Sequence, residues 1–164
     1  MKIKLILSIL LAIVFGASVY TQSSIPNGLK VNGLPLDAKY GDVIKKLGKP
    51  TREVTSRKIS ECIGSRTRTI NYPGLTIELV EGDNNIFTVY AFEIRSGNWN
   101  VSGTRIGDTS ANVERLFGTR GRTVEKSKTG QQWAYDMTLD SPGQSTFNFQ
   151  NGKVTQIYST YEMC

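Results

Sequence analysis

A correspondence between segments about seventy residues apart constrains the fold of this chain more than any other feature. The matched pairs are Val31-Asn32-Gly33 with Val101-Ser102-Gly103, residues 43–48 with 113–118, residues 75–79 with 145–149, and Gly82 with Gly152. Few positions are identical, but the pairs share one register over most of the length. Such a register predicts two copies of one supersecondary unit packed into a single body.

The first 22 residues have the pattern of a secretory signal peptide. Lys2 and Lys4 give a positive start, residues 5–15 form an almost unbroken apolar run, and small residues follow at 16–18. The apolar run is shorter than the roughly 20 residues that span a bilayer. We therefore predict a secreted or periplasmic protein with no stable membrane span after signal removal. An uncleaved anchor is the alternative.

Length and charge narrow the remaining possibilities. Removing the signal peptide leaves about 142 residues, enough for one ordinary domain or two very small ones. We predict a first unit at residues 23–98 and a second at 99–164, together forming one compact body. Without Lys2 and Lys4, eighteen basic residues stand against fourteen acidic ones, a net charge of +4. This mild excess gives no reason to predict nucleic-acid binding.

Cys62 and Cys164 are the two cysteines of the chain. In an exported protein an even number of cysteines indicates disulfide bonding, so we predict a Cys62–Cys164 bond. A closed loop of about 100 residues stabilises by up to ~4.7 kcal/mol in the chain-entropy model. A redox role is disfavoured because the chain has neither a Cys-x-x-Cys motif nor a histidine.

Hydrophobic periodicity predicts two short helices, each followed by antiparallel strands. Apolar residues fall on one helical face in residues 36–47, where Asp37 could cap the start and Gly48 the end, and again in residues 109–117. The predicted strands are residues 67–72, 75–80, 87–95, 131–138, 145–150 and 153–161, with weaker candidates at 52–63 and 120–125. The predicted fold class is therefore α+β. It consists of two tandem repeats, each a short helix followed by three to four antiparallel strands, with the helices on one face of the sheet.

Two short motifs carry a resemblance to a known superfamily. The helix end Leu47-Gly48-Lys49-Pro50 and the hairpin step Asn151-Gly152-Lys153-Val154 resemble those of small outer-membrane assembly lipoproteins, and the tandem arrangement resembles the β-lactamase inhibitory protein-like superfamily. The resemblance implies a secreted, non-enzymatic protein that grips another protein with the open face of its sheet. Two features depart from it, because no cysteine follows the signal peptide for lipidation and one disulfide would span both repeats. No contact residue can be carried over, so β-lactamase is not predicted as the target.

The residue types present disfavour catalysis. The chain has no histidine, which removes the commonest general base and nearly all ordinary zinc sites. Glu78, Glu81, Asp83 and Glu93 surround one predicted hairpin and could in principle hydrolyse glycosides. The alternative, which we favour, is that they shape a turn and line the wet face of the sheet. We predict no catalytic residue, no cofactor and no metal site.

Aromatic residues in or beside the predicted strands are the candidates for partner contact. Large aromatics with a polar tip are enriched at binding hot spots, and Trp99, Trp133, Tyr135 and Tyr158 have this character. The alternative is that they pack in the core, above all Trp133 and Tyr135 if their shared face is the helix-covered one. We expect a non-catalytic protein-binding module, inhibitor-like or an envelope-assembly accessory. A small-ligand or lipid-binding exported protein is the second hypothesis, and an exported hydrolase is the third.

Overall fold

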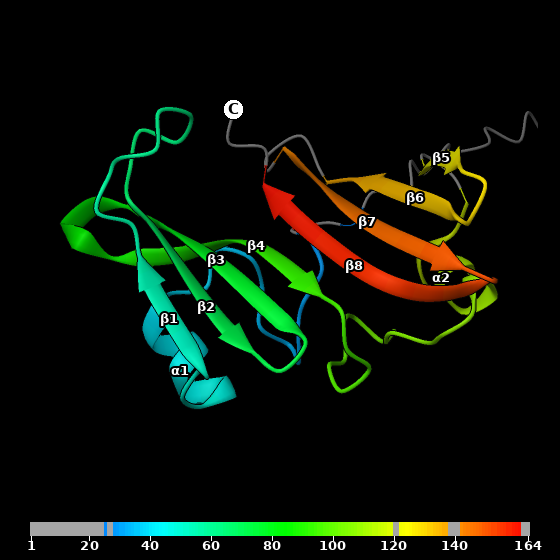
Figure 1. The fold of residues 1–164 in the computed structure, drawn as a ribbon, viewed down its shortest axis with the longest axis horizontal. Coiled ribbons are helices and arrows are strands. Elements are labelled where there is room, and N and C mark those ends of the chain that lie inside the picture. Colours follow the sequence, from blue (N-terminus) through cyan, green and yellow to red (C-terminus); the bar gives the residue numbers. More distant parts are fainter. Residues whose placement is uncertain (1–24, 26–27, 120–121, 138–141, 162–164) are drawn as a thin grey trace, which may run out of the picture.

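The computed structural model describes residues 25, 28–119, 122–137 and 142–161. They form one eight-stranded antiparallel sheet, two short α-helices and a single 3-10 turn (Figure 1). The elements in chain order are α1 (Tyr40–Leu47), β1 (Arg52–Thr55), β2 (Thr67–Tyr72), β3 (Leu75–Glu81), η1 (Asp83–Asn85), β4 (Phe87–Ile94), α2 (Ser110–Phe117), β5 (Arg122–Lys126), β6 (Gln131–Asp136), β7 (Gly143–Gln150) and β8 (Lys153–Tyr161). The predicted signal peptide at residues 1–22 lies outside the described residues.

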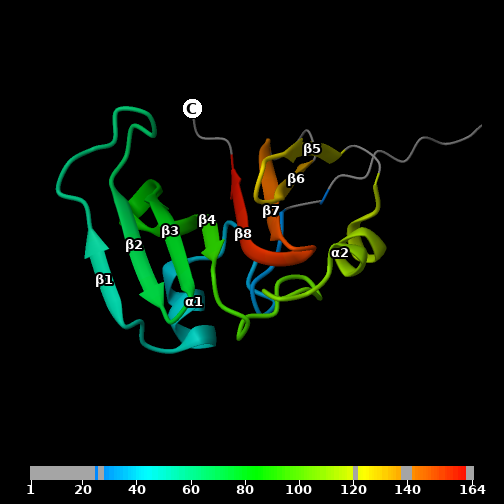
Figure 2. The same ribbon diagram turned by 45° about the vertical axis from the view of Figure 1, so that its right-hand side comes forward.

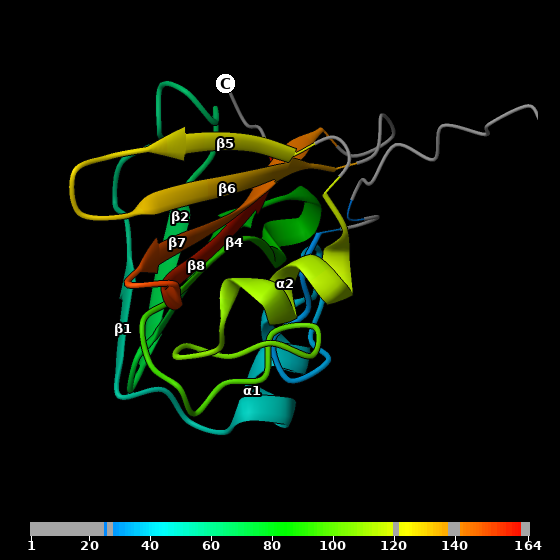
Figure 3. The ribbon, with the colours of Figure 1, turned by 90° about the vertical axis from the view of Figure 1, so that its right-hand side faces the viewer.

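The strand order is β1-β2-β3-β4-β8-β7-β6-β5, so β4 and β8 meet at the centre and β1 and β5 form the two edges. The central pair is antiparallel, with Ala91 opposite Thr160 and Ile94 opposite Ile157. Figures 1 and 2 show the first four strands on one side of this junction and the last four on the other. The sheet is strongly twisted, because β1 and β5 run in clearly different directions in Figure 3.

The predicted fold class, an α+β fold of two tandem helix-plus-sheet repeats, is wrong. The described residues form a sheet-dominated fold, and its two α-helices have only eight residues each. Direct pairing of β4 with β8 makes the eight strands one continuous sheet. The seventy-residue correspondence matches segments of similar local structure: residues 43–48 and 113–118 form the ends of α1 and α2, residues 75–79 and 145–149 lie in β3 and β7, and the segments at Val31 and Val101 form similar turns. Val31 pairs with Leu34, Val101 pairs with Thr104, and Val31 and Val101 also bridge to each other.

Each helix ends at a glycine that adopts a positive φ, Gly48 after α1 and Gly118 after α2. Gly48 has a φ of 80° and Gly118 a φ of 75°, values that favour residues without a Cβ. The Thr109 side chain caps α2 by accepting from the Asn112 backbone N–H at 3.3 Å. Asp37 does not cap α1, because it lies in the preceding turn with a φ of 67° and the helix begins later, at Tyr40. The shorter helix follows from this turn.

The core lies between the helices and the face of the sheet toward which they pack. Both helices lie on the same side of the sheet in Figure 3, and each contributes a fully buried valine, Val43 from α1 and Val113 from α2. The largest fully buried side chains include Tyr135, Phe92, Phe147, Leu29, Leu36 and Ile77. In the described part of the chain, no helix is long and apolar enough to cross a membrane.

Two tyrosines tie the helix ends to the sheet. The Tyr72 hydroxyl donates to the Gly48 carbonyl at 2.8 Å, and the Tyr135 hydroxyl donates to the Gly118 carbonyl at 3.0 Å. Burial is the main reason that the pKa of both hydroxyls is raised. These bonds satisfy carbonyls that the helix itself leaves unpaired at its C-terminus.

We expect Tyr135→Phe to lower the free energy of unfolding by about 1 kcal/mol, because it removes one hydrogen bond and keeps the ring. The ring contacts with Phe117 and Phe147 remain available. Urea denaturation followed by tryptophan fluorescence measures the change. The matched control is Tyr158→Phe, whose hydroxyl bonds to no described residue, and an equal loss in both variants would contradict this role.

Candidate functional site

The two faces of the sheet differ in chemistry. One face packs toward the helices and is apolar. The other, which we call the open face, carries no helix of the described chain (Figure 3). Strand alternation and register place these polar residues on the open face: Arg52, Thr67, Thr69, Asn71, Thr76, Glu78, Thr88, Glu93, Thr123, Glu125, Gln132, Asp136, Gln144, Thr146, Asn148, Gln150, Lys153, Gln156, Tyr158 and Thr160. The same register adds four apolar residues, Val54, Val80, Ala91 and Ala134. Tyr90 lies at a β-bulge and joins this face through its bond to Glu78. Most of the open-face side chains are therefore polar.

A row of hydrogen-bonded side chains crosses four strands of the open face. The Gln132 side chain in β6 donates to Oδ1 of Asn148 in β7 at 2.8 Å, and the Asn148 side-chain NH₂ donates to Oε1 of Gln156 in β8 at 2.8 Å. Gln156 then donates to the Glu93 carboxylate in β4, across the central strand junction. We call Gln132, Asn148, Gln156 and Glu93 the amide row. All four side chains are half-buried, so the row is partly shielded from competing water.

The carboxylate at one end fixes the direction of every bond in the amide row. An ionised carboxylate only accepts hydrogen bonds, so Gln156 must turn its NH₂ group toward Glu93 and its carbonyl toward Asn148. Asn148 and Gln132 must then also point their NH₂ groups toward the Glu93 end of the row. The Gln132 carbonyl is left at the far end, and no described residue donates to it. Arg95 secures the other end, where its Nε lies 2.7 Å from Glu93 Oε1.

Two tyrosines stand near the centre of the open face. Tyr90 donates its hydroxyl to Glu78 Oε2 at 2.8 Å. Burial, followed by the bond to Glu78, raises the pKa of Tyr90 far above its usual range. Tyr158 lies on β8 opposite Glu93 and is half-buried. Its hydroxyl bonds to no residue within the described ranges, so it is available to a partner.

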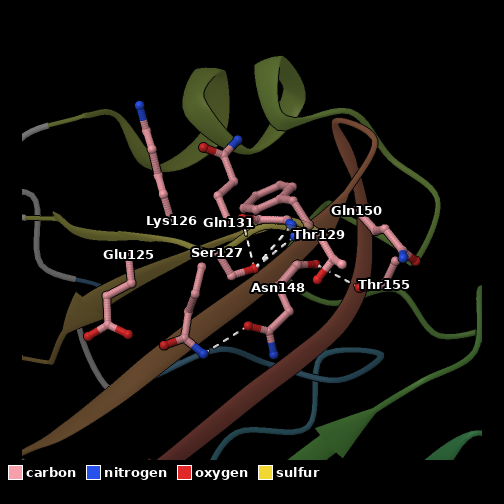
Figure 4. A pocket seen from close by; sticks show the side chains of 11 residues that line it. Glu125, Lys126, Ser127, Thr129, Gln131, Asn148, Gln150 and Thr155 are labelled. Atoms are coloured by element: carbon pink, nitrogen blue, oxygen red, sulfur yellow. Dashed lines mark hydrogen bonds between the residues drawn. The ribbon is translucent and has the colours of Figure 1, made fainter.

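A pocket of about 400 Å³ lies at the end of the β5–β6 hairpin, where the amide row begins. Its walls include Glu125, Gln132, Asn148 and the 127–130 turn, and Figure 4 shows Glu125 and Asn148 on one side of the strands with Lys126 on the other. Ser127 stabilises the turn by accepting from the Gly130 N–H at 3.1 Å. A Cβ on Gly130 would lie 2.1 Å from the Phe149 carbonyl oxygen, so the close approach of this wall requires glycine.

The structure does not bring the four predicted contact aromatics together. Trp133 is 5% exposed and Tyr135 is fully buried, so both are packing residues of the core. Trp99 is half-buried and donates its indole N–H to the Pro73 carbonyl at 2.9 Å. Of the four, only Tyr158 lies on the open face. The surface around Tyr158 is formed by its cross-strand neighbours Glu93 and Thr146, and neither tryptophan contributes to it.

The amide row was not predicted from the sequence. The sequence does contain a pattern that could have indicated it. Gln132, Asn148 and Gln156 each lie next to an aromatic or aliphatic core residue in their strand, so all three occupy positions that face away from the core. Tyr90 was not predicted for this face because it lies at a β-bulge. Glu78 pairs with Ala91 and Leu79 with Val89, so Tyr90 has no partner in β3 and the in–out alternation of β4 is interrupted there. The amide types alone did not reveal which strands are neighbours.

The four carboxylates that we considered for glycoside hydrolysis and disfavoured do not form one site. Glu81 accepts from Arg66, whose hydrogen bond and charge lower the pKa of the carboxyl. A carboxyl held ionised in this way is unsuited to act as the general acid of a glycosidase. Asp83 lies in the exposed 3-10 turn η1, while Glu78 and Glu93 belong to the open face. Within the described ranges, no group of three acidic or cysteine side chains could hold a metal ion.

The predicted disulfide falls partly outside the described residues. Cys62 lies in the connection between β1 and β2, whereas Cys164 is not among the residues that the structure describes. The Cys62–Cys164 bond therefore stays a prediction.

Comparison with known proteins identifies no family. No family model matches the chain, and no curated protein matches it. Among solved structures, the chain is similar to an extracellular protein containing an SCP domain from Bacillus anthracis str. Ames, with 10% sequence identity and a TM-score of 0.45. The match covers 76% of this chain and 43% of that protein. It establishes neither a shared fold nor a shared function, and the resemblance to the β-lactamase inhibitory protein-like superfamily stays a prediction.

We expect Asn148→Ala to lower the free energy of unfolding by about 1–2 kcal/mol, because it breaks the amide row on both sides. Adding Gln132→Ala should then cost less than Gln132→Ala alone, since their shared bond is already lost. Urea denaturation of the four proteins in this cycle measures both effects. Thr123→Ala, at an exposed position of the same face, is the control and should change stability by less than about 0.5 kcal/mol. Strict additivity of the two substitutions would show that the row is not coupled.

Proposed function

We propose that this chain is an exported, non-catalytic module that docks another protein on the open face of its sheet. The observation that carries the proposal is the amide row. Its side chains are polar, half-buried and already held in one orientation by each other, and no helix of the described chain covers them. Ordering a flexible side chain at an interface costs about 0.5–1.5 kcal/mol. A surface whose side chains are ordered beforehand avoids much of that cost.

The composition of the open face also suits protein recognition. Tyrosine supplies a large contact area with few rotatable bonds, and amide and hydroxyl side chains supply adaptable hydrogen bonds. Tyr90 and Tyr158 stand among such groups on two adjacent central strands.

The cavities support a ligand carrier less well. A site for a lipid or an apolar metabolite is concave and predominantly apolar. The hollow of about 670 Å³ beside α1 is lined more by apolar than by polar surface, but it is open to solvent and charged side chains border it, among them Asp37, Lys39 and Asp42. The 400 Å³ pocket at the amide row is lined mainly by amides, hydroxyls and charges. We therefore propose no second function.

The experiment is capture of partners from an extract of the source organism by the mature protein, compared with capture by two variants. Tyr158→Ala removes the central aromatic of the open face and should reduce capture at least about tenfold, as expected for a buried aromatic anchor. Lys45→Ala changes an exposed residue of α1 and should leave capture unchanged.

Two results would overturn the proposal. One is capture that survives Tyr158→Ala but is lost in Lys45→Ala, which would place the interface on the helical side. The other is co-purification of a lipid or metabolite with no protein.

A further inference from the structure

The pocket at the end of the amide row has two hydrogen-bond acceptors in its wall, the Glu125 carboxylate and the Gln132 side-chain carbonyl. Glu125 and Gln132 are register partners on adjacent strands and face the same way. Side chains in such positions have Cβ atoms about 4.5–5.5 Å apart, so one donor group can reach both. Lys126 also lines the pocket, but Figure 4 shows its side chain directed away from Glu125, toward the other side of the strands.

The amide row decides which atom of Gln132 is offered. Because the Glu93 carboxylate only accepts, each amide turns its NH₂ group toward β4, and the Gln132 NH₂ is engaged by Asn148. The Gln132 carbonyl is therefore the atom left for a ligand. A carbonyl beside a carboxylate favours a group that carries several donors and a positive charge.

The charge of the open face agrees with this chemistry, although the whole chain is basic. Its residues include four carboxylates, Glu78, Glu93, Glu125 and Asp136, against three cationic side chains, Arg52, Arg95 and Lys153. The chain as a whole carries a net charge of +6. The open face thus carries a small net negative charge within a basic protein, which suits a single cationic group of a partner near Glu125.

We propose that the partner docked on the open face inserts an arginine side chain into this pocket, where its guanidinium donates to the Glu125 carboxylate and the Gln132 carbonyl. The inference rests on the proposed docking function. Arginine fits better than lysine because its planar fork of five N–H donors matches two neighbouring acceptors. The same face already holds a guanidinium against a carboxylate, since Arg95 donates from its Nε to Glu93 at 2.7 Å.

The test uses two short peptides, acetyl-Gly-Gly-Arg-Gly-Gly-amide and the same peptide with neutral citrulline in place of arginine. Titration of ¹⁵N-labelled protein, followed by ¹H–¹⁵N correlation spectra, gives the affinity and the site of each peptide. We expect the arginine peptide to shift the signals of Gln132, Asn148 and the 127–130 turn. The citrulline peptide should bind at least about fivefold more weakly.

Two variants with the same loss of charge locate the site. Glu125→Gln should weaken the arginine peptide about tenfold, because the bond to a charged acceptor becomes a neutral one. Glu78→Gln removes a carboxylate from the same face but outside the pocket, and it should leave the affinity unchanged.

Equal binding of the two peptides, equal effects of the two variants, or shifts confined to α1 and α2 would each overturn the arginine proposal. The docking function fails separately. If partner capture depends on Tyr158 but the arginine peptide does not bind at the pocket, docking stands and the arginine assignment falls.

Discussion

Pairing of β4 with β8 is the interaction on which the rest of the structure depends. It joins strands that are sequentially distant, aligning Phe92 with Ser159 and Ile94 with Ile157. On the covered face it brings the apolar residues of both halves into one core. On the open face it places Gln156 beside Glu93, so the amide row can cross the junction. Without this pair neither the common core nor the continuous polar surface would exist.

The covered and open faces use arginine and glutamate in different ways. On the covered face, Arg68 stacks on the Phe87 ring at 4.1 Å and Arg122 stacks on the Trp133 ring at 3.8 Å. Each guanidinium also lies 3.2 Å from a glutamate, so these groups close the core near the edge strands. On the open face, Glu93 instead orients a chain of amides. Its bond to the largely exposed Arg95 contributes little stability by itself. Its consequence is the fixed direction of the row.

The sequence predicted local features better than long-range ones. The helix ends at Gly48 and Gly118 were predictable, because they follow from glycine conformation and nearby residues. Strand alternation predicted two faces, but it did not show which face the helices cover, so Trp133 and Tyr135 were proposed for partner contact and lie in the core. The fold class was wrong because β4–β8 pairing joins residues more than sixty positions apart, and no local pattern specifies it. The amide row was missed for the same reason.

Cross-strand nuclear Overhauser effects in solution test the central claim most directly. The account predicts contacts between the backbone protons of Phe92 and Ser159, and between the side-chain amide protons of Gln156 and the methylene protons of Glu93. Both follow from one β4–β8 junction that carries a core on one side and an ordered polar surface on the other. Absence of these contacts in a folded protein, with the two groups of four strands tumbling independently, would contradict it.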